Sequence, residues 1–520
     1  MHPLHSLRLH ALAGLRAIER VFDAVFGSSL NPLRHLGALG FMMFWLLAVS
    51  GIYLYMMLDT SVEGAYRSIE QLSHAPWLPG GMLRSLHRYA ADGFIIVMLA
   101  HLLREGLYGR YSGFRRFSWL TGIPLLLLAF INAIGGFWLN WDQLGQFSAQ
   151  ATAEWLDWLP LFASPLTRNF LGVDTVSDRL FSLFVFVHLG VPLLLVFGLW
   201  FHIQRVARAA VFPPRKLAIG TAITLVVLAA VAPVASQAPA NLAVTPTALA
   251  YDWLLLFVHP LTDATSPGFV WAVLTGALAL LFALPFLPQT TKVAPIAVVD
   301  PVNCNGCRRC FDDCPYSAVT MVAHPTRNQR QLAQVNADLC ASCGICVGAC
   351  PSSTPFRSAI ELVTGIDMPS APIGLLRRRI VQGLAALGEH PCKIAVFGCD
   401  HGVEVTQLAA PDVVTFSLMC MAQLPPSFVE YALRDGAAGV LVSPCAEGAC
   451  EFRLGQRWTA ERLEGSREPH LRASVPHERL AFASAGVGDE ATVLQALQSL
   501  RQQLAAAKRP TTTFPTPVHG

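Results

Sequence analysis

The distribution of apolar residues divides this chain of 520 residues into two regions. Long uncharged apolar runs fill residues 36–288, whereas the rest has the mixed polarity of globular domains. Six runs can each supply the roughly 20 residues that a helix needs to cross a bilayer. They lie at about residues 37–58, 86–106, 119–139, 180–203, 217–236 and 268–287. The pattern predicts a transmembrane helical bundle that is followed by globular domains.

The composition agrees with this division. Hydrophobic residues make up 53% of the chain and charged residues 14%, which is too apolar for an ordinary soluble protein. Part of the chain is therefore expected to lie in membrane lipid. The net charge of +3 is too small to indicate a nucleic-acid partner. Residues 1–30 alternate Leu, Val and Phe with Arg and His and lack the apolar core of a signal peptide, which favours an interfacial amphipathic helix.

Charges in the connections predict the orientation of the bundle. Arg and Lys gather before the first run, between the second and third, and between the fourth and fifth, while the other connections are richer in acids. The basic connections are expected to be cytoplasmic. An even number of crossings returns residue 290 to that side. All 13 cysteines lie after residue 300 and need a reducing compartment. Both signals predict that the cysteine-rich region lies in the cytoplasm, and the expected location of the chain is the inner membrane of a prokaryote.

Two apolar runs each carry a pair of histidines fourteen residues apart, His87 with His101 and His188 with His202. Fourteen residues span nearly four helical turns, so each pair lies on one face about 21 Å apart. The two helices run parallel, so His87 can face His188 and His101 can face His202. A lone intramembrane histidine would more often be a polar contact between helices. Two matched pairs instead predict two bis-histidine b haems, an arrangement suited to electron transfer.

Glycines repeat the same spacing on the neighbouring runs. Gly37 and Gly51 lie on the first run, and Gly122 and Gly136 lie on the third. A macrocycle that packs against a helix needs positions without a side chain. A single glycine could equally serve close helix packing. The shared spacing favours haem contacts.

These periods resemble the amino-terminal half of the cytochrome b family of quinol-oxidising bc-type complexes, over about residues 1–210. The resemblance also rests on Arg84 three residues before His87, on HLLREGLY at 101–108, and on GFWLNWDQ at 136–143. It implies that Arg84 and Arg104 pair with haem propionates, although each could be an ordinary surface arginine. It also allows a homodimer through this region.

Only two further helices follow where this family often has four. In the connection before the last run, Tyr251, Asp252 and Trp253 look like a degraded form of the family's Pro-Glu-Trp-Tyr quinol-site motif. The resemblance implies that Asp252 takes the place of the proton-accepting carboxylate, with Trp253 beside it. An ordinary loop acid is the alternative.

After a Pro-rich linker, two runs of the form C-x2-C-x2-C-x3-C-P follow one another. This is the signature of a ferredoxin domain with two [4Fe-4S] clusters, in which the fourth cysteine of each run ligates the other cluster. One predicted ligand set is Cys304, Cys307, Cys310 and Cys350. The other is Cys340, Cys343, Cys346 and Cys314. A zinc knuckle is the alternative, but it usually needs only pairs of cysteines.

The last 130 or so residues alternate apolar strands at 393–399, 413–416 and 439–442 with helical stretches, which predicts a small α/β domain. Cysteines follow the strand ends, and four of them can converge on one [2Fe-2S] cluster: Cys399, Cys420, Cys445 and Cys450. CMAQLPP at 420–426, CAEGAC at 445–450 and LGQR at 454–457 resemble the iron-sulfur delta subunits that link methanogen hydrogenases to heterodisulfide reductase. Zinc is the alternative metal. Cys392 has no counterpart, and we expect a free thiol there.

The expected fold is therefore multi-domain: an all-α transmembrane bundle, an α+β two-cluster ferredoxin domain and a small α/β iron-sulfur domain. The domains are expected at residues 1–210 (dihaem four-helix region), 211–290 (two further helices), 291–365 (ferredoxin), 385–505 (α/β) and 506–520 (flexible tail).

The expected function is respiratory electron transfer between quinone and a cytoplasmic flavoprotein, dehydrogenase or heterodisulfide reductase-like complex. The chain would then be the quinone-reactive subunit of an oxidoreductase. A haem-containing membrane anchor that docks such a complex, without its own quinone site, is the second hypothesis. No glycine-rich dinucleotide fingerprint follows a strand, so hydride chemistry would belong to the partner.

Overall fold

The computed structural model describes residues 3–74, 80–161, 164–204, 209–244, 246, 248–287, 295–357 and 361–506. The chain forms two compact units. The first comprises Met1–Gln204 and Ala209–Pro288, and the second contains Gln289–Gly520. Residues 507–520, where we expected a flexible tail, lie outside the described residues.

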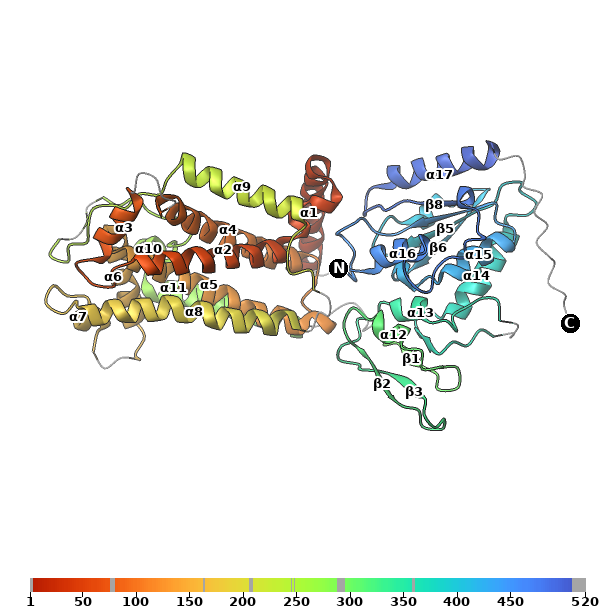
Figure 1. The fold of residues 1–520 in the computed structure, drawn as a ribbon, viewed down its shortest axis with the longest axis horizontal. Coiled ribbons are helices and arrows are strands. Elements are labelled where there is room, and N and C mark those ends of the chain that lie inside the picture. Colours follow the sequence, from red (N-terminus) through yellow and green to blue (C-terminus); the bar gives the residue numbers. More distant parts are fainter. Residues whose placement is uncertain are drawn as a thin grey trace. The chain divides into compact units, whose positions relative to one another are not determined.

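The first unit is helical throughout its regular structure in the described part of the chain. Its α-helices are α1 (Pro3–Phe26), α2 (Leu36–Met57), α3 (Ala65–Ser73), α4 (Gly80–Leu107), α5 (Arg116–Asn140), α6 (Gln143–Asp157), α7 (Leu166–Phe170), α8 (Asp178–Gln204), α9 (Arg215–Val231), α10 (Val258–Ala264) and α11 (Pro267–Ala283). Helix α2 packs along α4, α5 packs along α8, and α9 packs against α4. These long helices lie side by side in Figure 1.

The outer surfaces of the long helices are apolar. Val49, Met56, Phe186, Leu193 and Val231 each expose between 68% and 79% of their surface. So many large exposed apolar side chains would be costly in water and are normal against lipid. Together with the helix lengths, they identify a multi-pass membrane protein.

Helices cover all six predicted segments, but not all of them equally well. Among the described helices, four are long and apolar enough to cross a membrane: Leu36–Met57, Gly113–Asn140, Asp178–Gln204 and Pro267–Phe286. Helix α4 has 28 residues, which is long enough to cross a membrane, but it is not among these four. It carries the charged residues Arg88 and Asp92 in its first half. Helix α9 has 17 residues and ends at Val231, not at residue 236 as its apolar run predicted. Its apolar sequence continues into an irregular segment.

Buried polar contacts attach that irregular segment to the ends of α4 and α5. Asp142 begins α6, where its carboxylate accepts the backbone N–H of Gly145 at 2.8 Å and the N–H of Gln237 at 2.9 Å. Arg84 donates to Ser73 Oγ at 2.6 Å and to Ser236 Oγ at 2.7 Å. The segment after α9 therefore lies beside the His87 end of α4.

The second unit begins with two short antiparallel sheets. Strand β1 (Val298–Val299) pairs with β4 (Ile366–Asp367), and β2 (Val319–Ala323) forms a hairpin with β3 (Gln331–Val335). Helices α12 (Arg309–Asp312) and α13 (Ile345–Ala349) each follow the first cysteines of one motif. This is the expected α+β domain, in which each cysteine motif leads from a loop into a short helix.

A parallel sheet of four strands follows, in the order β6-β5-β7-β8. Its strands are β5 (Ile394–Cys399), β6 (Val413–Leu418), β7 (Gly439–Ser443) and β8 (Leu480–Phe482). The first three confirm the strands expected from the sequence, and β8 is additional. Helices α14 (Ile373–Ala386), α15 (Pro426–Arg434), α16 (Gly455–Leu463) and α17 (Glu490–Ala506) accompany the sheet (Figure 1).

Alternate residues of the central strand serve the two faces of the sheet. Phe397 lies in the core formed with Ile380 of α14 and Phe428 of α15, whereas Val396 lies in the core formed with Leu497 of α17. Both strand residues are fully buried. This explains why β5 is a continuous apolar run, which is the pattern of a parallel strand covered on both faces.

Candidate haem and iron-sulfur sites

Each of the four ladder histidines lies against one of the four predicted glycines. A Cβ atom placed on Gly51 would lie 3.1 Å from the ring of His87, and one on Gly37 would lie 3.5 Å from the ring of His101. On the other helix pair, the corresponding distances are 3.0 Å from Gly136 to His188 and 3.1 Å from Gly122 to His202. The shared spacing therefore has a structural cause: every glycine makes room for one histidine ring.

The Nδ1 atoms of three of these histidine rings lie within hydrogen-bond distance of polar groups. His87 Nδ1 lies 2.9 Å from Ser50 Oγ, and His202 Nδ1 lies 3.1 Å from Thr121 Oγ1. His188 Nδ1 lies 3.1 Å from the carbonyl of Asn132. Metal-binding histidines usually donate their second ring N–H to such a group, which fixes the ring and the tautomer. These contacts leave Nε2 of each ring for a metal.

The spacing of the rings also fits a metal between them. The ring centroids of His87 and His188 are 6.4 Å apart. Two imidazoles that bind one metal ion from opposite sides, at about 2 Å each, have ring centres about 6 Å apart. His101 and His202 stand at the other level, fourteen residues further along the same two helices. The histidines at both levels therefore fit haem as ligands, and haem would supply reversible one-electron chemistry when bound.

Sequence reasoning missed the hydroxyl partners of the histidines, although a signal for them exists. Ser50 directly precedes Gly51, and Thr121 directly precedes Gly122. The glycine admits the ring of a histidine, and the preceding hydroxyl reaches its Nδ1 atom. A hydroxyl residue before a periodic glycine is therefore the pattern that points to these groups.

The two arginines assigned to propionates are buried in networks with acids. Arg84 lies 3.3 Å from Glu70 and also binds Ser73, Ser236 and Asn140. Arg104 Nε donates to Glu19 Oε1 at 2.8 Å, and its Nη1 lies 3.3 Å from Glu105. Both guanidinium groups thus stand one helical turn from a histidine. Their pairing with propionates remains a proposal.

The proposed quinone motif lies between α9 and α10, with Asp252 half-buried and paired. Its carboxylate forms an ion pair with Arg88 and accepts the backbone N–H of Leu255 at 2.7 Å. Trp253 is 72% exposed. Tyr251 packs edge-on against Phe147 of α6, with ring centroids 5.4 Å apart. Its buried hydroxyl has no hydrogen-bond partner among the described residues, and burial raises the pKa of Tyr251 to about 12.

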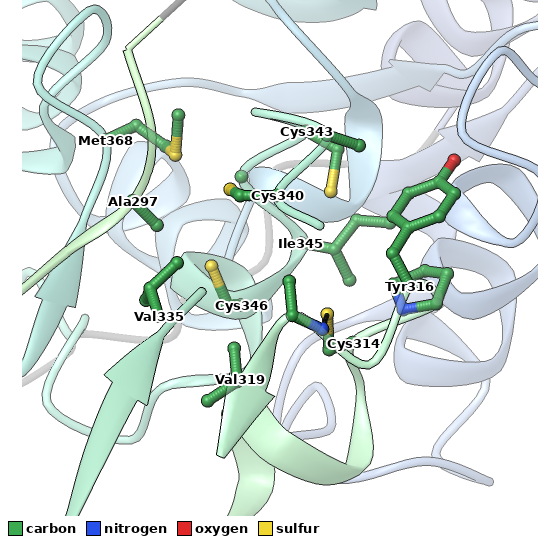
Figure 2. Close-up of a pocket in the computed structure, with 14 residues that line it drawn as sticks. Ala297, Cys314, Tyr316, Val319, Val335, Cys340, Cys343, Ile345, Cys346 and Met368 are labelled. Atoms are coloured by element: carbon green, nitrogen blue, oxygen red, sulfur yellow. Dashed lines mark hydrogen bonds between the residues drawn. The ribbon is translucent and has the colours of Figure 1, made fainter. Parts of the chain in front are cut away.

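In the second unit, two cavities are lined by the two predicted sets of cysteines. One, with about 330 Å³ free of protein atoms, is lined by Cys314, Cys340, Cys343 and Cys346. The other, with about 310 Å³, is lined by Cys304, Cys307, Cys310 and Cys350. In each cavity the cysteine that precedes proline comes from the opposite motif, as the crossover predicts. Figure 2 shows the first set around its cavity, with Ala297, Val335 and Met368 among the apolar residues beside it.

Burial makes these thiols poor acids on their own. It raises the pKa values of Cys310 and Cys343 to about 12. These cysteines would therefore lose their protons only on binding iron, so cluster assembly would be coupled to proton release. Cys307 is the exposed cysteine of its set, so the cluster there would reach the protein surface.

The four cysteines of the α/β domain meet at the carboxyl edge of the sheet. Cys399 ends β5, Cys420 follows β6, and Cys445 and Cys450 follow β7. The thiols of Cys399 and Cys445, of Cys445 and Cys450, and of Cys450 and Cys420 lie close enough to interact. All four are buried. This convergence fits a metal site with four thiolates, for either a [2Fe-2S] cluster or zinc.

Cys392 stands apart from this set. It precedes β5, at the opposite end of the strand from Cys399, and its backbone N–H donates to Nδ1 of His390 at 3.2 Å. Burial raises the pKa of the Cys392 thiol. Its position is that of a free thiol.

Three family matches divide the chain at the same places. Residues 21–209 match the family described as cytochrome b/b6/petB, and residues 303–354 match the 4Fe-4S dicluster domain. Residues 394–507 match the family described as the delta subunit of methyl-viologen-reducing hydrogenase. The fold and these matches define a membrane electron-transfer protein.

Individual relatives are similar to about half of this chain. Cytochrome b of Rhodospirillum rubrum is 26% identical over 294 residues, which cover 51% of this chain and 72% of that protein. A solved structure described as a hyperthermophilic respiratory complex III is similar with a TM-score of 0.39 at 20% identity, over 49% of this chain and 75% of that chain. This chain joins a cytochrome b region, which binds haem b, to a 4Fe-4S dicluster domain and a hydrogenase delta-subunit-like domain.

Proposed function

We propose that this protein passes electrons between membrane quinone and a cytoplasmic redox partner, through two b haems, two [4Fe-4S] clusters and one [2Fe-2S] cluster. The membrane unit lies in the inner membrane of a prokaryote, and the iron-sulfur unit lies in the cytoplasm. Support for this orientation comes from the basic connections on one side and from the 13 cysteines, which need a reducing compartment. The partner is a flavoprotein, a dehydrogenase or a heterodisulfide reductase-like complex.

The arrangement of the histidines carries this proposal. Four rings stand at two depths on α4 and α8, each against a glycine. Three of them have Nδ1 engaged by Ser50, Thr121 or the carbonyl of Asn132. An unspecific polar contact between helices needs neither the paired glycines nor the oriented rings. The two levels provide two haems along the membrane normal, so electron transfer between them moves charge across the bilayer and works with or against the membrane potential.

A quinone site near the haem level of His87 and His188 is supported by Tyr251 more than by Asp252. The Tyr251 hydroxyl keeps its proton at neutral pH and is a buried donor without an acceptor among the described residues. A quinone carbonyl would be such an acceptor, and the ring of Phe147 would supply an apolar wall. Asp252 can receive a quinol proton only if Arg88 releases it.

Anaerobic reduction of the purified protein by a short-chain quinol tests the proposal. If the haem absorption bands change to those of reduced haem, a working quinone site lies on this chain. EPR signals of reduced clusters would show that electrons reach the second unit. The matched variants are Tyr251→Phe, which removes the hydroxyl, and Tyr66→Phe, which removes a hydroxyl bound to the carbonyl of Gln237. Slower reduction only in Tyr251→Phe supports the site.

The second candidate function is a haem-containing anchor that docks a cytoplasmic complex and has no quinone site of its own. The ion pair between Arg88 and Asp252 favours it, because the paired carboxylate is a poor proton acceptor. Full reduction by dithionite with no reduction by quinol supports this candidate. Unchanged quinol reduction in both Asp252→Asn and Tyr251→Phe would place any quinone site elsewhere.

The metal of the last cysteine set is a separate question with a direct test. Iron and sulfide analysis of the wild type and of Cys445→Ala measures what the set holds. Loss of two iron atoms and of a [2Fe-2S] EPR signal agrees with the proposal. Loss of one zinc atom with unchanged iron would overturn that part of it.

A further inference from the structure

A fully buried arginine in the second unit is not itself a member of any cysteine set. Arg462 on α16 is 1% exposed. Its Nη2 donates to Asp313 Oδ2 at 2.6 Å, and its Nη1 donates to the carbonyl of Ala422 at 2.8 Å. Such a buried ion pair contributes little to stability compared with well-packed apolar residues. Its location therefore needs another explanation.

The arginine lies between two metal sites. Asp313 directly precedes Cys314, which lines the cavity shown in Figure 2. Ala422 follows Cys420 of the α/β site by two residues. A Cβ atom on Gly348 would lie 2.8 Å from Arg462 Nη1, and Gly348 belongs to α13, which carries Cys346. The guanidinium thus touches the helix and the loop that hold ligands of both sites.

Helix α16 itself extends from one site toward the other. At its first residue, a Cβ atom on Gly455 would lie 2.2 Å from Cys420 Sγ and 3.4 Å from Cys450 Sγ. Arg462 follows seven residues later, about 10 Å along the helix axis. The first residue of α16 therefore packs on the sulfurs of the α/β site. Arg462, near the end of the same helix, binds Asp313 beside the ferredoxin site.

The carboxylate that pairs with Arg462 also pairs with a second cation. Asp313 accepts a second guanidinium, because Arg467 Nη1 donates to its Oδ1 at 2.7 Å. Arg467 also donates to Glu461 Oε2 at 2.7 Å, so Asp313 is the carboxylate that Arg462 and Arg467 share, and Glu461 pairs with Arg467 alone of these two. The Nε–H of Arg462 has no acceptor among the described residues. An arginine stays charged in proteins. In a buried environment its field is weakly screened and stabilises nearby groups that gain negative charge.

We propose that Arg462 is a positioning residue for electron transfer, which holds the ferredoxin and α/β domains in contact and raises the potentials of the two metal sites on either side of it. The proposal rests on the cluster assignments of the proposed function. One electron leaves the reduced cluster and arrives at its oxidised neighbour, and no bond is formed or broken. The buried cation favours the reduced form of each of the two metal sites, so it raises both reduction potentials together.

Redox titration of the full chain, followed by EPR, tests this proposal. It compares a variant that removes the cation with one that removes the anion. Arg462→Met removes the cation and is expected to move the midpoint potential of a [4Fe-4S] signal downward. Asp313→Asn removes the anion and is expected to move the same signal upward. Arg462→Lys keeps the charge and is expected to stay near the wild type. Arg472→Met is the control, since Arg472 is exposed and pairs with Glu430.

A merely structural role would lower stability in both charge variants without giving shifts of opposite sign. Unchanged midpoints in Arg462→Met and Asp313→Asn, with cluster signals intact, would overturn the proposal. If Arg462→Met does not fold, Asp313→Asn alone is the test. An upward shift of its [4Fe-4S] midpoint potential supports the proposal, and an unchanged midpoint overturns it. Absence of cluster signals in the wild type would instead contradict the proposed function, so the two failures are distinguishable.

Discussion

The hydroxyl of Ser50 lies 2.9 Å from Nδ1 of His87. The same hydroxyl lies 2.6 Å from the carbonyl of Leu46, to which it donates its own proton. Its oxygen is therefore left to accept the Nδ1–H of His87. This fixes the tautomer of the ring and presents Nε2 as the metal-binding nitrogen.

Replacing Ser50 with Ala is expected to raise the midpoint potential of the haem bound by His87. The accepted hydrogen bond makes the imidazole a stronger donor, which favours ferric iron, and its loss favours ferrous iron. A tenfold change in the relative stability of the two states corresponds to about 59 mV for one electron. Spectroelectrochemical titration of the haem bands measures the shift.

Two variants control that experiment. Ser50→Thr keeps the hydroxyl and should titrate like the wild type. Thr121→Ala removes the equivalent contact of His202 and should shift the other haem. A shift of the same haem in both alanine variants would contradict the assignment of one hydroxyl to each level.

Replacing Gly136 with Val is expected to remove the haem at one level only. Even a Cβ atom at this position would lie 3.0 Å from the ring of His188, and the branched side chain of valine takes still more of that space. Pyridine haemochrome analysis should then give about half the wild-type haem per protein, with the His101 and His202 level retained.

Gly135 offers a matched control on the next residue. Nothing lies within 4 Å of a Cβ atom placed on it, so Gly135→Val changes the same helix without crowding a histidine. Its haem content should equal that of the wild type. Equal losses in both variants would indicate that helix α5 tolerates no valine here, and not that a haem contact was lost.

The crossover of the cysteine motifs predicts which variants resemble one another. Cys350→Ala should leave the same residual [4Fe-4S] EPR signal as Cys304→Ala, because both residues line one cavity. Cys314→Ala should match Cys340→Ala for the same reason. Cys392→Ala should change neither signal. A match between Cys350→Ala and Cys340→Ala would show that each motif binds its own cluster.

Much of this arrangement could be predicted from the sequence, because it depends on short-range periodicity. The spacing of His87 and His101 follows from helix geometry, and the crossover of Cys350 follows from the motif it ends. Contacts between distant segments could not be predicted in this way. Arg462 and Asp313 are 149 residues apart, and neither belongs to a repeated pattern. The pairing of Arg88 with Asp252 likewise depends on how the segment after α9 folds back onto α4.

Acid is expected to destabilise the membrane unit through His259. This residue is 1% exposed, its Nε2 lies 3.1 Å from Ser148 Oγ, and burial lowers the pKa of His259 to about 4. In the unfolded chain the same residue binds a proton near pH 6.5. Between these values the unfolded state holds more protons, so stability falls as the pH drops from about 6.5 to about 4. The loss amounts to at most about 3 kcal/mol.

Thermal unfolding in detergent at pH 7.5 and pH 5, followed through the haem bands, measures this loss. His259→Gln should show a smaller drop between the two pH values than the wild type, although its stability at pH 7.5 is lower. His470→Gln, which replaces a histidine with 46% of its side chain exposed, should keep the full drop. Protonation of haem ligands lowers stability equally in all three proteins, so only the difference between variants reports on His259. Equal drops in the wild type and His259→Gln would exclude this residue as the acid-sensitive group.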